Sequence, residues 1–439
     1  MPTSLKRPVI HNFPTLRLNC PSPVRLANGM QMWVIGNGED EINRFTLIMG
    51  GGAMHESKAM TAYITAANVL QGSNRFSPEQ VAQLLDYYGA WKASQSHDFC
   101  SILSISSLNE HFEKMLDLFK SCVTEPSFPD DELSVLKQRL AGNCATSRQQ
   151  VATLAGDAMK QLYYGPTHPL SRVTTPEGIL SIDRNDIMQF YVQHYNASNA
   201  RIILAGKIGD KELATVERVF GSWTANGPVD NDDEPPIVPQ DKMLQIVDKP
   251  GAVQSAINIT LRAIPRRHPD YNKLRILIMA LGGYFGSRLN QNIREEKGYT
   301  YGIRGFLAGR KADAYIGINT ECATQYTWRI IDEVKLEMLK LQNKPIPKVE
   351  LDVVKQHIIS DLAKSFDTPF TMAEYVNGTL LNGTYPEYFN DQIDTLQTVT
   401  APELQELAQR YLLPEKMRIV IAGDAQAINH LKLYRPEKS

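Results

Sequence analysis

The 439-residue sequence has little cysteine and lacks the spacings that mark common metal and redox sites. Its five cysteines, Cys20, Cys100, Cys122, Cys144 and Cys322, form no CxxC pair, which excludes a zinc ribbon and a thioredoxin-like motif. We expect reduced, buried thiols that behave as small apolar side chains. No two of the nine histidines lie four residues apart, so no helix can present an i, i+4 histidine pair to a metal ion. A metal site built from histidines or cysteines far apart in the sequence stays open.

The sequence also lacks an excess of charge of one sign and lacks long apolar runs. The 46 lysines and arginines against 48 aspartates and glutamates leave a net charge of −2, which gives no footprint for nucleic acid. No apolar run approaches the roughly 20 residues of a membrane span, and the first residues, MPTSLKRPVIHNFPTL, lack the apolar core of a signal peptide. We therefore expect a cytoplasmic, soluble protein with neither a membrane nor a nucleic-acid partner.

An internal repeat sets the organisation of the chain. Residues 181–207 and 398–424 share a helical pattern that ends at a tyrosine, a short polar turn, and an apolar strand that ends in Ala-Gly. The two segments lie half a chain apart. Helix, turn and strand are a common succession, but the near-equal spacing favours a duplication.

A segment rich in proline and acidic residues separates the two copies. Residues 226–241 read NGPVDNDDEPPIVPQD, which is typical of an exposed linker. We predict an N-terminal lobe over residues 1–225, this linker over 226–241, and a C-terminal lobe over 242–439.

Strands and helices are expected to alternate in both halves, with strands in sequential pairs. This order favours an α+β fold with a mainly antiparallel sheet and packed helices in each lobe over a doubly wound parallel sheet. The expected strands are residues 30–35, 44–49, 93–99, 99–106, 201–206, 255–261, 299–306, 314–321 and 418–423. The expected helices include residues 59–70, 78–88, 109–123, 269–281, 287–297, 327–341 and 348–365, and one long helix or two over 129–164.

The helix expected over residues 109–123 has the clearest amphipathic pattern. Phe112, Met115, Leu116 and Phe119 recur at helical spacing and should form one buried face.

Several short motifs occur in a fixed order across both halves: RLANGMQMWVI near the start, GGAMHE at 51–56, QGSNRFS at 71–77, YGAWKASQSHDF at 88–99, EPSFPDDEL at 125–133, YYGPTHPLSR at 163–172 and LGGYFGSRLNQNIREEKGYTYG at 281–302. Through them the chain resembles the pitrilysin/insulinase-like metallopeptidase family, in the size range of its processing-protease-like members. The resemblance implies two duplicated, metallopeptidase-like lobes with ferredoxin-like subdomains.

The zinc motif of that family is not present. The family carries HxxEH on a helix and a distal glutamate as third ligand, with the glutamate of the motif as general base for a zinc-bound water. Counting from the Gly72-Ser73 pair, the resemblance places Tyr63, Ala66 and Ala67 at the motif and Asn143 at the distal position. Alanine has no donor atom, and a phenol with a pKa near 10 is a poor ligand at neutral pH.

Asn143 also falls on a helical stripe with leucines 133, 136 and 140, where we expect it to fill a polar niche. The resemblance therefore implies that this chain binds no metal and carries no catalytic residue in its N-terminal lobe. A shifted alignment is the competing explanation, but no HxxEH, HExxH or HxxxH occurs in the chain.

The second half retains a motif with chemistry. Active members of the family carry an arginine and a tyrosine seven residues apart that contact the substrate, and these map onto Arg294 and Tyr301. Arg294 offers a fixed charge with planar donors and Tyr301 a phenolic donor. We expect Ser287 to cap the helix and Gly298 to end it, with Tyr299, Tyr301 and Ile303 alternating along the next strand. The structural alternative is that Arg294 stabilises the helix dipole as a surface charge and that Tyr301 is simply an aromatic residue of the sheet.

Two further features precede a strand that could take an added peptide strand. Trp91 and Lys92 stand before residues 93–99, where binding of a peptide by β-augmentation and simple core packing are both open. His168 is expected to order a turn.

The resemblance implies a zinc-less Arg/Tyr subunit of a heteromeric metallopeptidase. Such a subunit pairs with a homologous HxxEH subunit that carries the zinc and completes its site in trans for peptide hydrolysis, being inactive alone. The isolated chain could also form a homodimer. The alternatives are a structural core or chaperone-like homologue without a peptidase role and a self-sufficient protease with an unrecognised site.

Overall fold

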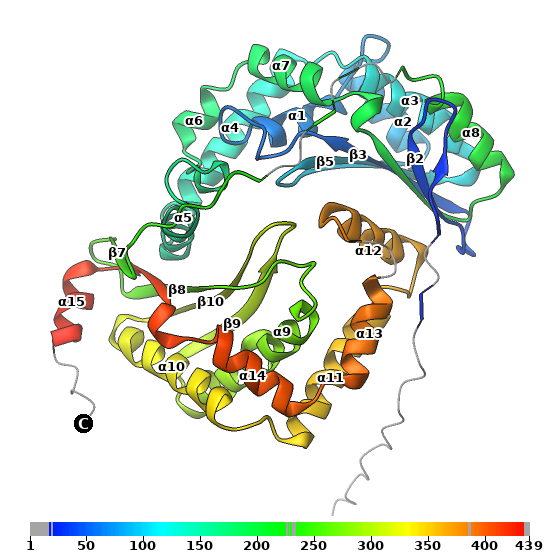
Figure 1. Ribbon diagram of the computed structural model, residues 1–439. Coiled ribbons are helices and arrows are strands. Elements are labelled where there is room, and N and C mark those ends of the chain that lie inside the picture. The colour runs from blue at the N-terminus through cyan, green and yellow to red at the C-terminus, as the bar shows by residue number, and fades with distance from the viewer. Residues whose placement is uncertain are drawn as a thin grey trace, which may run out of the picture.

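The computed structural model describes residues 17–18, 21–224, 227, 229–230, 234–384 and 388–433. Two β-sheets, one from each half of the chain, face each other across the molecule, and most helices cover their outer faces (Figure 1). This arrangement confirms the α+β fold with two mainly antiparallel, helix-covered sheets.

The N-terminal sheet has six strands in the order β1-β2-β6-β3-β5-β4. Only the pair β2 and β6 is parallel, and β4 lies at an edge, paired with β5. The strands are β1 (Val24–Arg25), β2 (Gln31–Ile35), β3 (Ile42–Gly50), β4 (Trp91–Ser96), β5 (Cys100–Leu108) and β6 (Arg201–Gly206).

The C-terminal sheet repeats this order with five strands, β7-β11-β8-β10-β9. Its one parallel pair, β7 and β11, corresponds to β2 and β6, and its edge strand β9 corresponds to β4. The strands are β7 (Leu244–Asp248), β8 (Gln254–Arg262), β9 (Thr300–Gly309), β10 (Ala314–Ala323) and β11 (Arg418–Gly423). The strands of the internal repeat, β6 and β11, thus hold equivalent places.

Helices of the first half pack mainly on the outer face of its sheet. The predicted apolar face of α3 is buried, with Phe112, Met115, Leu116 and Phe119 at most 2% exposed. The helices are α1 (Thr61–Val69), α2 (Pro78–Tyr87), α3 (Phe112–Thr124), α4 (Asp130–Ser147), α5 (Val151–Tyr164), α6 (Pro176–Leu180), α7 (Arg184–His194) and α8 (Asp210–Phe220). Residues 129–164 therefore form two helices.

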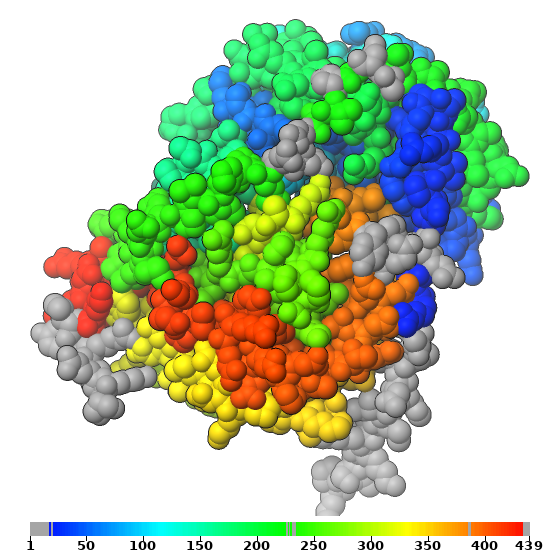
Figure 2. All heavy atoms as spheres, in the orientation of Figure 1, coloured from blue at the N-terminus to red at the C-terminus, as the bar shows by residue number. Residues whose placement is uncertain are grey.

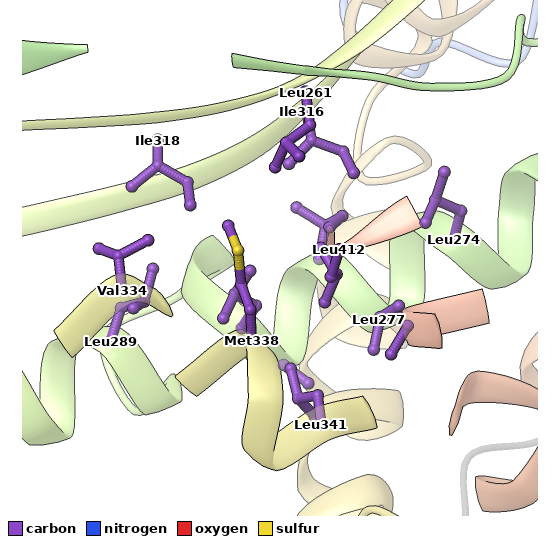
Figure 3. Packing of buried hydrophobic residues seen from close by; sticks show 14 of the residues in the cluster. Leu261, Leu274, Leu277, Leu289, Ile316, Ile318, Val334, Met338, Leu341 and Leu412 are labelled. Atoms are coloured by element: carbon purple, nitrogen blue, oxygen red, sulfur yellow. The ribbon is translucent and has the colours of Figure 1, made fainter. Parts of the chain in front are cut away.

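The second half has its own core between sheet and helices. Figure 3 shows Ile316 and Ile318 of β10 above Met338 and Leu341 of α10. The helices are α9 (Tyr271–Ile278), η4 (Met279–Gly283) and η5 (Asn290–Glu296), both π-helical, then α10 (Thr327–Asn343), α11 (Lys348–Lys364), α12 (Pro369–Leu381), α13 (Tyr388–Thr398), α14 (Ala401–Tyr411) and α15 (Ala425–Leu433). In the described part of the chain, no helix has the length and apolar character needed to cross a membrane.

Each half lends one helix to the inner face of the other sheet. Helix α5 packs on β8 and β11, with Ala155 against Ala256 and Val420. Helix α12 packs on β2 and β6, with Val376 among Trp33 and the inner residues of that sheet. In Figure 2 the orange residues of this region lie directly below the blue and green first half.

The linker is less exposed than its composition suggests. Oδ1 of Asp230 lies 2.7 Å from Nδ1 of His194, within hydrogen-bonding distance, and the Asp230 side chain is only 10% exposed. Further along, Gln240 donates its backbone N–H to Leu162 of α5. Residues 226, 228 and 231–233 of the predicted linker lie outside the described residues. The expectation of a wholly exposed segment is therefore wrong at Asp230, because a buried histidine offers its carboxylate a partner.

Candidate functional site

Arg294 stands on the π-helical segment η5. The N–H of Lys297 donates to the carbonyl oxygen of Asn292 at 3.2 Å, five residues back, which is the spacing of a π-helix. Gly298 then adopts φ +63° and donates its N–H to Arg294 O at 3.1 Å, ending the helix in the left-handed conformation predicted for it. Single π-helical turns are uncommon and often occur at functional sites.

The guanidinium of Arg294 is held on an exposed ring. It lies 4.3 Å from the centroid of Phe285, and its Nη1 lies 3.3 Å from Oε1 of Glu295. Phe285 is 64% exposed, so this cation–π contact faces solvent. One face of the guanidinium is thus positioned by the ring, while the side chain keeps a third of its surface exposed.

Tyr301 is displayed outward by a β-bulge. The register between β9 and β10 shifts between Thr320 and Cys322, so an extra residue of β9 is left without a partner. The hydroxyl of Thr300 donates to Glu321 O at 2.7 Å, and that of Thr320 donates to Gly302 O at 2.8 Å. The side chain of Tyr301 is 95% exposed as a result.

The bulge overturns the predicted alternation of this strand. Tyr301 and Ile303 were expected on one face, yet Ile303 is 3% exposed and packs in the core. Tyr299 stacks on Tyr326 with ring centroids 4.7 Å apart. The pairing of Thr300 with Thr320 is non-local, so local alternation could not anticipate it.

Arg294 and Tyr301 lie on consecutive elements at the edge of the C-terminal sheet. η5 packs against β9, and β9 is the edge strand. Among the described residues no hydrogen bond or ring contact joins the two side chains. The structure therefore brings both groups to the same edge of the C-terminal sheet.

The positions that the family resemblance assigns to the zinc motif lie in the other half. Tyr63 is 37% exposed and Ala67 half-buried, and both are on the least buried side of α1, whereas Ala66 is 1% exposed. Helix α1 packs against α4, α7, β4 and β5, all within the first half. Two alanines provide no donor, so these residues do not fit a zinc ion. Within the described residues, no group of three histidine, cysteine, aspartate or glutamate side chains could hold a metal ion.

Asn143 does not fill the polar niche predicted for it. Leu133 and Leu136 of α4 are buried, but Asn143 is exposed. Helix α4 shows little apolar face beyond Ala141. The buried stripe of the helix therefore ends before this residue.

The edge strand β4 bears on one of the two interpretations of Trp91, that of core packing. Trp91 is 49% exposed, so it does not serve as a core residue. Nζ of Lys92 donates to Leu70 O and Gln71 Oε1 at the end of α1, and burial lowers the pKa of this amine. β4 is an edge strand that pairs with β5, and the binding of a peptide strand along its other edge stays a prediction.

His168 orders a turn as predicted. Its Nδ1 accepts the N–H of Leu170 at 3.2 Å, and its ring stacks on Tyr164 with centroids 4.9 Å apart. Burial lowers the pKa of this imidazole.

Sequence reasoning missed two features near Arg294 and Tyr301. The ring of Phe285 under the guanidinium could have been noticed only as one aromatic in a glycine-rich motif. The second feature is a cavity beside β9, the strand of Tyr301, that is lined by Arg266, Arg275 and Arg304. Its arginines are scattered over 39 positions with no common motif, so they could not be grouped before the fold was known.

Comparison with known proteins finds that the chain is similar to proteins described as peptidases or as peptidase homologues. A family model described as "Peptidase M16 inactive domain" matches residues 181–358. The uncharacterized zinc protease YmxG of Bacillus subtilis is 21% identical over 367 residues, which cover 82% of this chain and 88% of that protein. The non-peptidase homolog YmxG of Helicobacter pylori is 22% identical over 258 residues, 58% of this chain and 59% of the relative.

Solved structures match over nearly the whole chain. The peptidase M16 inactive domain from Pseudomonas fluorescens has a TM-score of 0.84 at 23% identity, covering 93% of this chain and 99% of that one. A chain of Complex III2 from Candida albicans has a TM-score of 0.73 at 15% identity, with coverage of 93% and 99%. At such identities the likeness establishes the fold alone.

Proposed function

The chain belongs to the M16, pitrilysin-like family of metallopeptidases as a homologue without the zinc motif, and from this we propose that it is the Arg/Tyr subunit of a heteromeric peptidase. In this proposal Arg294 and Tyr301 complete, in trans, the substrate site of a homologous partner that carries HxxEH and the zinc. The isolated chain would then be inactive.

One observation carries the proposal. Tyr301 is almost fully exposed on a bulge where the hydroxyls of Thr300 and Thr320 contact each other and the neighbouring backbone. Arg294 lies on the π-helical segment η5, which packs against the same strand. An exposed phenol on so constrained a backbone makes no contribution to the core. Two donors displayed at one sheet edge suit the recognition of a group supplied by another molecule.

The division of work follows from the residues. The zinc and its water would belong to the partner, and this chain would supply donors to the peptide. Arg294 would donate to the carbonyl oxygen next to the bond that is cut and to the negative charge that grows on it, and Tyr301 would donate its phenolic proton to the same region. Donors preorganised for developing charge contribute about 10²–10³-fold to turnover each.

Mixing the purified chain with an HxxEH homologue tests the proposal. We expect cleavage of an internally quenched peptide by the mixture and by neither protein alone, with zinc found in the partner. Arg294→Ala and Tyr301→Phe should each reduce kcat about a hundredfold or more while the complex still elutes as one species.

Matched controls separate catalysis from folding. Arg329→Ala removes another exposed arginine, on α10, and Tyr87→Phe removes the hydroxyl of a tyrosine that is 80% exposed. Both should leave turnover unchanged. Normal turnover with Arg294→Ala and Tyr301→Phe would overturn the proposal. A cytoplasmic location is part of the proposal, and cell fractionation tests it.

A non-catalytic role as a structural or chaperone-like homologue is the second candidate. A relative is itself named a non-peptidase homolog. This candidate predicts that the chain forms a stable complex with the HxxEH homologue without adding peptidase activity. It also predicts that Tyr301→Phe changes the result of no assay.

A further inference from the structure

A cavity of about 500 Å³ opens where β9 meets α9, α12 and α13. Three arginines line it: Arg266 after β8, Arg275 on α9 and Arg304 on β9. We call it the arginine cavity. Its other walls mix aromatic and apolar residues, such as Phe306 and Met279, with polar ones, such as Ser365 and Gln392.

The three guanidinium groups have no carboxylate partner among the described residues. Arg266 and Arg275 are half-buried, and Nε of Arg266 is buried without a hydrogen bond. Arg266 lies over the ring of Tyr271 at 5.4 Å and Arg304 over that of Phe306 at 5.8 Å. A buried cation without a hydrogen-bonding anion is costly, so such groups are normally paired.

The two carboxylates that line the cavity are engaged elsewhere. Oε1 of Glu374 lies 3.4 Å from Nη1 of Arg44, across the boundary between the two halves. Asp361 contacts Nζ of Lys364 at 2.9 Å and Nε2 of His357 at 3.4 Å. Three arginines against two occupied carboxylates leave the cavity positive.

The two buried tyrosines nearby show that the arginines converge. Burial raises the pKa of both Tyr271 and Tyr388, and the positive charges of Arg266 and Arg275 oppose that rise in each case. Both guanidinium groups therefore act on the same small volume.

We propose that the arginine cavity binds a peptide carboxylate, supplied by an acidic side chain or by the peptide's C-terminus. That the ligand is a peptide rests on the proposed function. Arg304 follows Tyr301 by three positions on the same edge strand, a span of about 10 Å at the rise of a β-strand. A peptide lying along β9 past Tyr301 reaches the cavity within a few residues.

The chemistry of the walls fits this ligand. Guanidinium groups bind carboxylates by short, charge-assisted hydrogen bonds, often in pairs. The side chains of Met279, Phe306 and Leu307 offer apolar surface for the rest of the residue. The attraction is electrostatic, so it should weaken as salt rises.

Binding of three fluorescent peptides to the full-length chain alone tests the proposal. The peptides share one sequence that ends in glutamate. The first has a free C-terminus, the second is amidated, and the third is amidated with glutamine in place of glutamate. Fluorescence anisotropy at low salt should give an affinity for the first that is about ten- to a hundredfold above that for the third.

The second peptide identifies the source of the carboxylate. If the second peptide binds as tightly as the first, the cavity binds the glutamate side chain. If it binds as weakly as the third, the cavity binds the C-terminal carboxylate. Equal affinity for all three, or no detectable binding of any, would overturn the proposal.

Variants tie the effect to the cavity. Arg275→Gln and Arg304→Gln should each remove most of the preference for the charged peptide, whereas Arg410→Gln, an exposed arginine on α14, should keep it. Arg304 is exposed, so its variant should fold even if Arg275→Gln does not, and circular dichroism checks both. A preference that survives Arg304→Gln in folded protein contradicts the assignment.

The experiment needs neither a partner nor cleavage, so its result is independent of trans completion. A chain that discriminates carboxylates but gives no activity with an HxxEH homologue would refute the proposed function and leave the cavity assigned. Activity with an HxxEH homologue, combined with equal affinity for the three peptides, would support the proposed function and overturn the assignment of the cavity.

Discussion

The hydroxyl of Tyr163 lies 2.9 Å from Oδ2 of Asp313 and 3.1 Å from the carbonyl oxygen of Ala314. Tyr163 belongs to α5 of the first half, and Asp313 closes the turn between β9 and β10 of the second. Tyr163 is 2% exposed, and burial raises the pKa of both side chains. The contact therefore joins the two halves through a partly buried polar pair.

Removing this hydroxyl should loosen the two halves. In Tyr163→Phe the half-buried carboxylate of Asp313 loses one of its hydrogen-bond donors and keeps the backbone N–H of Ala314, so we expect a loss of about 1 kcal/mol in the free energy of unfolding at neutral pH. Urea unfolding followed by fluorescence measures it. Tyr87→Phe, on the exposed surface, is the control and should change stability little. An unchanged midpoint for Tyr163→Phe would show that the pair contributes nothing.

The ion pair between Lys273 and Glu403 should give a stability that is lost in acid. Nζ lies 2.6 Å from Oε1, and hydrogen bonds from Lys273 and Thr400 lower the pKa of Glu403 to about 2 from 4.5. A lowered folded-state pKa means that the contribution is complete above pH 4.5 and disappears as the pH falls through about 2.

Glu403→Gln measures that contribution. Since the carboxylate is 39% exposed, solvent screening limits the loss at neutral pH to about 1 kcal/mol or less. The gap in unfolding free energy between the variant and the parent should close as the pH falls from 4.5 toward 2. A gap that stays constant over this range would assign the effect to the helix cap rather than to charge.

The thiols should differ sharply in reactivity. Cys122 and Cys322 are at most 3% exposed, and burial raises the pKa of each to about 11. Roughly a thousandth of such a thiol is ionised at pH 8, so it reacts slowly. In a Cys20→Ser background, which removes a residue outside the described part, a disulfide reagent should label Cys144 first, because it is only half-buried.

The remaining thiols should react only after guanidinium chloride is added. Cys144→Ser in the same background should abolish the fast phase. Fast labelling that persists in this double variant would contradict the burial of the other thiols.

Much of the fold was predictable because its signals are local. The face of α3 follows from apolar residues at helical spacing, and the equivalence of β6 and β11 follows from two similar segments. The sheet that a helix covers is a different matter. Nothing in the apolar residues of α5 or α12 says that each packs on the sheet of the other half, because that choice depends on the path of the whole chain.

The candidate site shows the same limit. Arg294 and Tyr301 could be found through a motif, but the outward direction of Tyr301 depends on hydroxyl contacts between Thr300 and Thr320, which lie on different strands. Asn143 could be placed on a helix, but its exposure depends on where the neighbouring helices end. The position of a residue along a helix or strand can be predicted from the local sequence. The direction and burial of its side chain depend on the other elements that pack against that helix or strand.

Rebuilding three ligands tests whether the missing zinc motif has been located correctly. Tyr63 and Ala67 lie on the less buried side of α1, Asn143 is exposed on α4, and these helices pack together. Tyr63→His, Ala67→His and Asn143→Glu together should create a His₂Glu set of the kind that holds catalytic zinc. Ala66 is left unchanged, since it is 1% exposed and a larger side chain there would overpack the core.

We expect the parent to contain almost no zinc after dialysis and the triple variant to approach one zinc per chain by mass spectrometry of the metal. A double variant without the Asn143→Glu change is the matched control and should bind more weakly, because two histidines alone leave the coordination incomplete. The readout is metal content and not activity, so it tests the geometry of α1 and α4 directly. Zinc content in the triple variant no higher than in the double variant would mean that these positions do not converge and that the alignment with the family's motif is shifted.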